Sequence, residues 1–163
     1  MRHGRLLVRI AALGLLVLTG GPATAASLQL VVITAPGAPR LAFDKDVLRN
    51  VYLKRIFVDA DGVKLTPVNL PAGSPLREAF ARTIVRMSDE RMQAYWDQQY
   101  FQGVSPPYVL GSEDAVVRFV ATTPGAVGYV ASCHVDASVH VVLALPWPLT
   151  GGAPDPCAGH AAP

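Results

Sequence analysis

The sequence predicts an α/β fold in one compact domain that covers residues 26–146. Short apolar runs occur at Leu28–Thr34, Ala126–Val130 and Val139–Leu145, and such runs are typical of strands. The first of them is rich in β-branched residues and is expected to be buried. Between them lie segments whose apolar residues recur at helical spacing, each after a residue that can cap a helix. Strands that alternate with helices indicate the α/β class.

The first 25 residues have the organisation of a secretory signal peptide. Three arginines precede an apolar core, Ile10–Leu18, and the small residues Ala23–Ala25 follow it. We therefore expect cleavage before Ala26 and export of the remaining chain to the periplasm. The apolar core is too short to predict a transmembrane helix. The last segment, residues 147–163, is rich in proline, glycine and alanine and is predicted to be a poorly ordered tail.

The charge of the chain is nearly balanced once this leader is set aside. The whole chain has 14 basic and 12 acidic residues, but three of the basic residues are the leader arginines. The others form no basic stripe along the sequence. The composition therefore argues against nucleic acid as a partner.

After the first strand, the sequence predicts a helix, a turn and a second strand. Asp44 can cap the helix. The apolar face of this helix is formed by Val47, Leu48, Val51 and Tyr52. Asp59–Gly62 has the composition of a turn, and it lacks most of the ligand pattern of a calcium loop. Val63–Asn69 is predicted to return as a strand.

The segment PVNLPAGSPLREAF, residues 67–80, predicts the end of that strand, a tight turn and the start of a helix. Gly73 can form the turn, and Ser74 can cap the helix. Pro75 suits the first helical position, where its missing N–H group is not needed. Apolar residues at helical spacing extend this helix to Met87.

The start of this helix is also the candidate ligand site. A helix N-terminus presents backbone N–H groups and a positive dipole end, which suit an anion. Arg77 in the first turn is unfavourable against that dipole unless a negative group lies near, either Glu78 or a bound oxyanion. We therefore expect Ser74, Leu76 and Arg77 to be the ligand-binding residues. The alternative is an ordinary capped junction that binds nothing.

Two more helices are expected in the second half of the chain. Ser88 can cap the first of them. One face of this helix carries Met92, Tyr95, Trp96, Gln99 and Tyr100. We expect this aromatic stripe to pack in the core rather than to hold a ligand. Ser112 can cap the second helix, which the sequence TTPG ends.

The two cysteines, Cys133 and Cys157, are expected to form a disulfide. Export places them in an oxidising compartment, where two cysteines of one small domain usually pair. A metal site formed with His134 and His160 is the competing interpretation, although its spacing fits no common zinc pattern. The third interpretation is that both cysteines are free thiols. We expect no metal.

The order of these segments resembles a known family. A helix ending in VYLKR, the PVNLPAGSPLREAF segment and the sequence TTPGAVGYV together resemble small single-domain relatives of periplasmic phosphate-binding proteins, the substrate-binding components of phosphate ABC transporters. The resemblance covers residues 28–145. It implies the type 2 periplasmic-binding-protein fold, reduced to about one compact domain. It also implies phosphate or another small oxyanion as ligand and an ABC permease as partner. A membrane sensor is the partner expected if the fold is only an interaction module, and no cofactor is expected.

The chain departs from this family at the turn itself. Full-length phosphate binders read R-x-D-G-S-G-T there, and the arginine pairs with the anion. Gly73 and Ser74 match this motif, but Leu70 stands at the arginine position. The donors that remain are the Ser74 hydroxyl and the backbone N–H groups of Leu76 and Arg77. Restoring the arginine by Leu70→Arg is expected to tighten phosphate binding if the backbone there follows the family geometry.

Two functional hypotheses follow. The first is an exported solute-binding protein that holds a small oxyanion weakly. The second is a degenerate binding fold that acts as a periplasmic protein-interaction or sensor-accessory module without a solute. Catalysis is not expected, because His134, His140 and His160 lie in no recognisable nucleophile–base motif.

Overall fold

The computed structural model of the 163-residue chain describes residues 28–37, 41–147 and 156–158. The predicted leader, residues 1–25, and most of the predicted tail lie outside the described residues. None of the helices that the described residues form combines the length and the apolar character needed to cross a membrane.

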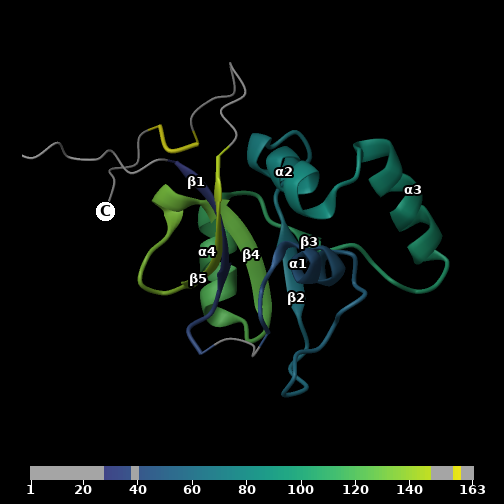
Figure 1. Ribbon diagram of the computed structural model, residues 1–163, viewed down its shortest axis with the longest axis horizontal. Coiled ribbons are helices and arrows are strands. Elements are labelled where there is room, and N and C mark those ends of the chain that lie inside the picture. The colour runs from purple at the N-terminus through teal and green to yellow at the C-terminus, as the bar shows by residue number, and fades with distance from the viewer. Residues whose placement is uncertain (1–27, 38–40, 148–155, 159–163) are drawn as a thin grey trace, which may run out of the picture.

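Strands and helices alternate along much of the described chain (Figure 1). The strands are β1 (Gln29–Thr34), β2 (Thr66–Asn69), β3 (Tyr108–Val109), β4 (Ala126–Ala131) and β5 (His140–Pro146). The helices are α1 (Lys45–Tyr52), α2 (Pro75–Phe80), α3 (Asp89–Tyr100) and α4 (Glu113–Thr122). A π-helical segment, η1 (Ala81–Val85), continues α2, and a short 3-10 turn, η2 (Ser132–His134), follows β4.

The strands of the described chain form one mixed sheet in the order β3-β2-β4-β1-β5. β1 lies between β4 and β5 and is antiparallel to both. β2 is parallel to β4 on one side and to β3 on the other. The predicted α/β class is therefore confirmed, with a sheet that is parallel on the side of β2 and antiparallel on the side of β1.

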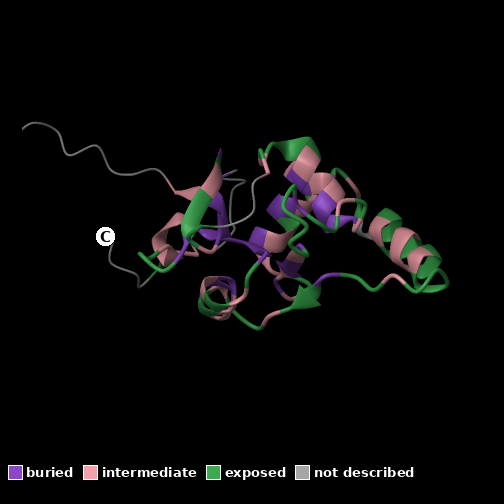
Figure 2. Ribbon diagram, turned by 90° about the horizontal axis from the view of Figure 1, so that it is seen from below, coloured by how far each residue is buried: buried purple, intermediate pink, exposed green. Residues whose placement is uncertain are grey.

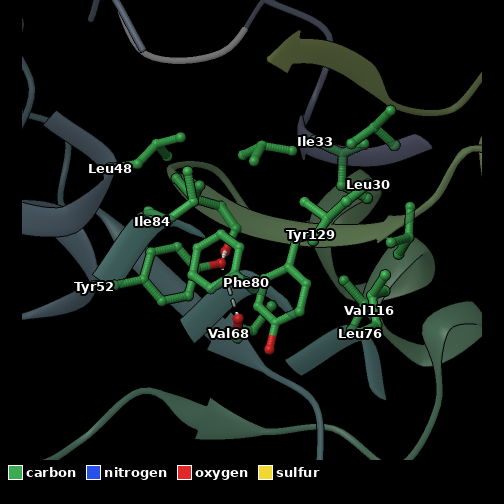
Figure 3. Packing of buried hydrophobic residues seen from close by; sticks show 14 of the residues in the cluster. Leu30, Ile33, Leu48, Tyr52, Val68, Leu76, Phe80, Ile84, Val116 and Tyr129 are labelled. Atoms are coloured by element: carbon green, nitrogen blue, oxygen red, sulfur yellow. Dashed lines mark hydrogen bonds between the residues drawn. The ribbon is translucent and has the colours of Figure 1, made fainter. Parts of the chain in front are cut away.

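Helices cover both faces of this sheet, as the neighbours of β4 show. Successive strand residues point to opposite faces, and all six residues of β4 are buried. The Tyr129 ring lies against Tyr52 of α1 and Phe80 of α2 (Figure 3). Gly128 points to the other face, where a Cβ atom would lie only 2.5 Å from the Val116 side chain of α4. Burial on both faces explains why β4 is apolar throughout.

The four predicted helix caps are all present. The side chains of Asp44, Ser74, Ser88 and Ser112 accept hydrogen bonds from backbone N–H groups in the first turns of α1, α2, α3 and α4. Capping of this kind satisfies donors that have no partner within the helix. The four helices begin where the sequence predicts.

The helix that was expected to continue to Met87 differs in its second half. Regular α-helical bonding stops after Phe80, and η1 ends at Arg86, whose φ of 58° lies in the left-handed region. Arg49 of α1 donates from Nε to the Val85 carbonyl group at 2.9 Å. This tertiary bond satisfies a carbonyl group at the helix end, and helical spacing alone does not reveal it.

Two strand boundaries also differ from the prediction. β2 begins at Thr66 rather than Val63, because the residues before it form a small hairpin closed by the bridge between Val58 and Lys64. β3 is not among the strands that the sequence predicts. It pairs with the end of β2, but a strand of two residues is too short to show a periodic pattern.

The prediction that α3 packs in the core is wrong. None of the α3 residues whose exposure the structure describes is buried (Figure 2). Tyr100 at its end is 73% exposed. Tyr95 attaches the helix to the rest of the domain by donating a hydrogen bond to the Leu53 carbonyl group at 2.6 Å. Met92 and Trp96, which are also half-buried, border a cavity, and Met92 packs against the outside of the core cluster.

Cys133 and Cys157 are joined by a disulfide, with their Cα atoms 5.8 Å apart. The bond links η2, just after β4, to the described residues 156–158. This geometry corresponds to the first of the three cysteine interpretations. The metal alternative also needed His160, which lies outside the described residues.

Candidate functional site

A cavity of about 500 Å³ lies between α2, α3 and the edge of the sheet. Asn69, the last residue of β2, and Gly73, in the turn before α2, contribute to one wall. Trp96 of α3 and Val109 of β3 contribute to others. The carboxyl ends of parallel strands are where open α/β sheets commonly bind ligands, so this cavity is the candidate functional site.

Of the three predicted ligand-binding residues, Ser74 and Leu76 lie beside the cavity rather than in its lining. The Ser74 hydroxyl accepts a hydrogen bond from the Arg77 backbone N–H group at 3.4 Å, which makes it the cap of α2. Leu76 has its side chain in the core, with 2% of its surface exposed. Its backbone N–H group is therefore its only polar contribution near the turn. The Arg77 N–H group, expected to be available to a ligand, is already used by the cap.

Arg77 is the predicted residue that lines the cavity. Its Nη1 atom donates to the Leu70 carbonyl group at 2.8 Å, which fixes the guanidinium group beside the end of β2. A guanidinium group has five N–H donors, so the remaining donors can serve a ligand. The structure thus brings the side chain of Arg77, rather than its backbone, to the site.

Leu70, at the position of the family's arginine, has a buried side chain that is 2% exposed. It belongs to the hydrophobic core cluster of the domain. An arginine placed there would bury an unpaired charge, which is strongly destabilising. The expectation that Leu70→Arg would tighten phosphate binding is therefore corrected.

A hydrogen-bond network that the sequence analysis missed fixes the wall of the cavity near β2. The Leu70 backbone N–H group donates to the Tyr129 hydroxyl oxygen at 3.4 Å. The Tyr129 hydroxyl group in turn donates to the side-chain carbonyl oxygen of Asn69. Asn69 could have been suspected as a polar residue at the end of a buried strand. Its pairing with a residue 60 positions away could not.

The two tyrosines behind this wall are held in their neutral form. Burial raises the pKa of the Tyr52 hydroxyl group well above its usual value of 10.0, and the nearby Tyr129 raises it further. Burial also raises the pKa of Tyr129, although the Leu70 hydrogen bond and the charge of Arg77 act in the opposite direction. Tyr52 donates to the carbonyl groups of Val68 and Val127 at 3.0 and 3.2 Å, so its proton already has acceptors.

The outer wall of the cavity is mostly aromatic and apolar. Trp96 and Tyr100 of α3 face it, together with Pro106 and Pro107 of the following loop. Among the described residues, the acidic side chains that line it are Glu78 and Asp97. This arrangement combines a large apolar surface with a small number of polar groups, as ligand pockets commonly do.

A second polar cluster, far along the chain from these residues, tethers η2 to α4. His134 donates from Nδ1 to Asp114 at 2.8 Å, and its Nε2 atom lies 3.8 Å from Glu113. Glu113 also accepts the Ala131 backbone N–H group at 2.6 Å. Within the described part of the chain, no group of three or more His, Cys, Asp or Glu residues is arranged to hold a metal ion.

Comparison by sequence reveals no relative: no protein-family model matches the chain, and no curated protein is similar to it. Comparison by structure does. A protein assigned as a phosphate ABC transporter substrate-binding protein, from Clostridium perfringens and with bound phosphate, is similar with a TM-score of 0.56 and 19% identity. An ABC-type phosphate transport receptor from Vibrio cholerae is similar with a TM-score of 0.53 and 20% identity. PstS from Borrelia burgdorferi is similar with a TM-score of 0.52 and 15% identity.

These similarities concern part of each protein. Each covers 71% of this chain but only 44%, 46% and 47% of the three solved proteins, in the same order. The chain therefore matches less than half of their length. At these identities the likeness establishes the fold: the chain shares the α/β architecture of a part of phosphate substrate-binding proteins.

Proposed function

We propose that the chain is an exported periplasmic solute-binding protein that holds a small oxyanion, such as phosphate, weakly and without catalysis. The observation that carries this proposal is the position of Arg77, whose guanidinium group lines the cavity at the carboxyl end of β2. The description of the similar solved structures as phosphate transport proteins supports it. An ABC permease is the partner that such a role implies.

The main proposed contacts are the remaining N–H groups of the Arg77 side chain in the cavity lining. The Leu76 backbone N–H group and the Ser74 hydroxyl group, beside the cavity, are proposed as secondary contacts at its rim. A charge-assisted hydrogen bond contributes about 1.5–3 kcal/mol. With few such bonds, and with Glu78 and Asp97 lining the same cavity, we expect dissociation constants for inorganic anions of about millimolar.

Isothermal titration calorimetry with phosphate and with sulfate tests this proposal. Arg77→Gln should weaken binding, because it removes the charge that faces the cavity. Arg118→Gln is the matched control, since Arg118 is an exposed residue of α4 on the other face of the sheet. Equal weakening by both variants would contradict a specific role for Arg77. Absence of binding at millimolar phosphate and sulfate would reject an inorganic anion as ligand.

The alternative function, an interaction or sensor-accessory module without a solute, is favoured by one observation. Tyr100, which lines the cavity, and Phe101, whose ring contacts it, are 73% and 88% exposed. Tyr108, next in sequence to the lining residue Val109, is 67% exposed. Exposed aromatic residues in a group often mark protein contacts. This alternative predicts that replacing Tyr100 and Phe101 by serine abolishes association with a membrane permease or sensor but leaves the melting temperature unchanged.

A further inference from the structure

We infer that the preferred ligand is not an inorganic anion but a carboxylate attached to an aromatic or other apolar body. The carboxylate would be held by Asn69 and Arg77, and the apolar body would lie against the α3 side of the cavity. The inference rests on the proposed function, because it uses the same cavity, and it names the class of solute.

Asn69 is oriented as a hydrogen-bond donor toward the cavity. The Tyr129 hydroxyl oxygen already accepts the Leu70 N–H group, so the hydroxyl proton is available for the Asn69 carbonyl oxygen. This bond fixes which end of the Asn69 amide faces Tyr129. The amide nitrogen, with its two N–H groups, is left without a hydrogen-bond partner among the described residues. An acceptor such as a carboxylate oxygen would satisfy it.

Leu70 places the second donor close to the first. Its carbonyl group binds Arg77 Nη1 at 2.8 Å, while its N–H group binds the tyrosine that orients Asn69. One residue after β2, Leu70, therefore anchors both donor side chains at the same wall of the cavity. An amide and a guanidinium group together offer donors to the two oxygens of one carboxylate.

The opposite wall has the character of a site for an apolar body. It includes Met92, Trp96 and Tyr100 of α3, and Pro106, Pro107 and Val109 after it. Aromatic rings and proline rings provide large apolar surface for stacking and burial. A volume of about 500 Å³ is in the range of sites for organic ligands, and an inorganic phosphate ion would leave these residues without a contact.

The charges in the cavity disfavour a ligand with two negative charges. Glu78 and Asp97 line it together with Arg77. Gln93 donates to Asp97 at 2.7 Å, which satisfies part of that carboxylate but leaves its charge. A phosphate dianion would bring two charges and more acceptor oxygens than these donors can satisfy, at a large loss of hydration. A carboxylate brings one charge and two oxygens.

Calorimetric titration with phenylacetate, acetate, phenylacetamide and phosphate tests the inference. Phenylacetate should bind at least about tenfold more tightly than acetate, because only phenylacetate buries a ring. It should also bind at least about tenfold more tightly than phenylacetamide, which lacks the charge that Arg77 would pair with. Equal affinity for phenylacetate and acetate, or for phenylacetate and phenylacetamide, would overturn the inference.

Asn69→Asp is the decisive variant, because it keeps the acceptor for Tyr129 and replaces the amide donor by an oxygen. Phenylacetate affinity should fall by about tenfold or more. Asn50→Asp is the control, since it adds the same charge on α1 outside the cavity lining, and affinity should remain unchanged. If Asn69→Asp does not fold, Trp96→Leu provides the test: the advantage of phenylacetate over acetate should shrink. An unchanged affinity ratio would refute the role of this wall.

The two proposals fail in different ways. If phosphate binds more tightly than phenylacetate, and Arg77→Gln weakens it, the inorganic ligand is correct and the present inference is wrong. If none of the four compounds binds at millimolar concentration, the solute-binding proposal itself fails together with the inference.

Discussion

The ring of Phe80, on α2, stacks on the ring of Tyr129, on β4, with the ring centroids 4.0 Å apart and the planes inclined by only 5° (Figure 3). Arg77 lies one turn before Phe80 on the same helix, and Asn69 is bonded to the Tyr129 hydroxyl group. The stack therefore connects α2, which carries Arg77, to the tyrosine whose hydroxyl group orients Asn69 of β2. The stability of the domain and the shape of the cavity depend on the same contact.

Stability is expected to fall steeply above about pH 10, because burial raises the pKa of Tyr52 and Tyr129 above 10.0. The unfolded chain loses these protons near pH 10, and the folded chain loses them later. The folded chain therefore holds more protons in this range, and the free energy of unfolding decreases as pH rises through it. Each tyrosine contributes a slope of about 1.4 kcal/mol per pH unit.

Urea unfolding measured at several values between about pH 9 and pH 11 gives this slope. Tyr129→Phe should be less stable at neutral pH by about 1–3 kcal/mol, because Asn69 and Leu70 lose a partner, and its slope above pH 10 should be shallower. Identical slopes for the variant and the wild type would mean that Tyr129 does not titrate as expected.

Gly128→Ala should destabilise the domain by about 1–3 kcal/mol, since α4 packs directly on the backbone of β4. The new Cβ atom would lie 2.5 Å from Val116 and 3.0 Å from Val120. Adding Val116→Ala to the same chain should recover part of the loss by making room. Gly111→Ala is the control, because nothing lies within 4 Å of the added atom there. The test is the melting temperature of the wild type, the two single glycine variants and the double variant. An equal loss of stability in Gly128→Ala and Gly111→Ala would contradict the packing argument.

Ser74→Ala should lower the free energy of unfolding by about 1 kcal/mol, because it removes the cap of α2. Ser112→Ala removes the equivalent cap of α4 and should have a similar effect on stability. Only Ser74→Ala should also weaken anion binding, since α2 carries Arg77 into the cavity and α4 lies on the other face. If both substitutions weaken binding equally, a general loss of stability explains the result instead.

Reduction of the Cys133–Cys157 disulfide should lower the free energy of unfolding by about 3 kcal/mol. The reason is that the bond restricts the conformational entropy of the unfolded chain, by an amount that depends on the length of the closed loop. Thiol titration of the purified, non-reduced protein should detect no free thiol in the denatured chain. Replacement of both cysteines by alanine should reproduce the effect of reduction. Two titratable thiols would show that the protein does not carry the bond in solution.

Leu70→Arg should destabilise the domain by about 3–5 kcal/mol, because the arginine would be buried without a partner. Leu70→Met keeps the volume and should be tolerated at a loss below about 1.5 kcal/mol. Circular dichroism and urea unfolding compare the two. A stable Leu70→Arg protein with tighter phosphate binding would show that this position can turn toward the cavity as it does in the family motif.

Local chemistry made much of the architecture predictable. A helix start depends on a side-chain oxygen that accepts a hydrogen bond from a backbone N–H group only two or three residues later. Asp44, Ser74, Ser88 and Ser112 could therefore be assigned as helix caps from the sequence. Continuous apolar runs predicted β1 and β4, because strands buried on both faces have no polar side to alternate. An apolar run also predicted β5, although this edge strand is mostly exposed or half-buried. The placing of Arg77 near a candidate site followed from its position after the Gly73 turn.

Contacts between distant segments decided the rest. Whether the aromatic face of α3 fills the core or borders a cavity depends on what packs against it, and the spacing of Tyr95, Trp96 and Tyr100 is the same in both cases. Likewise, the pairing of Tyr129 with Asn69 joins residues on β4 and β2 that become neighbours only through the parallel alignment of these strands. Periodicity reports one face of one element, whereas a binding site is formed where several elements meet, so the sequence alone determined the elements and the tertiary structure determined the site.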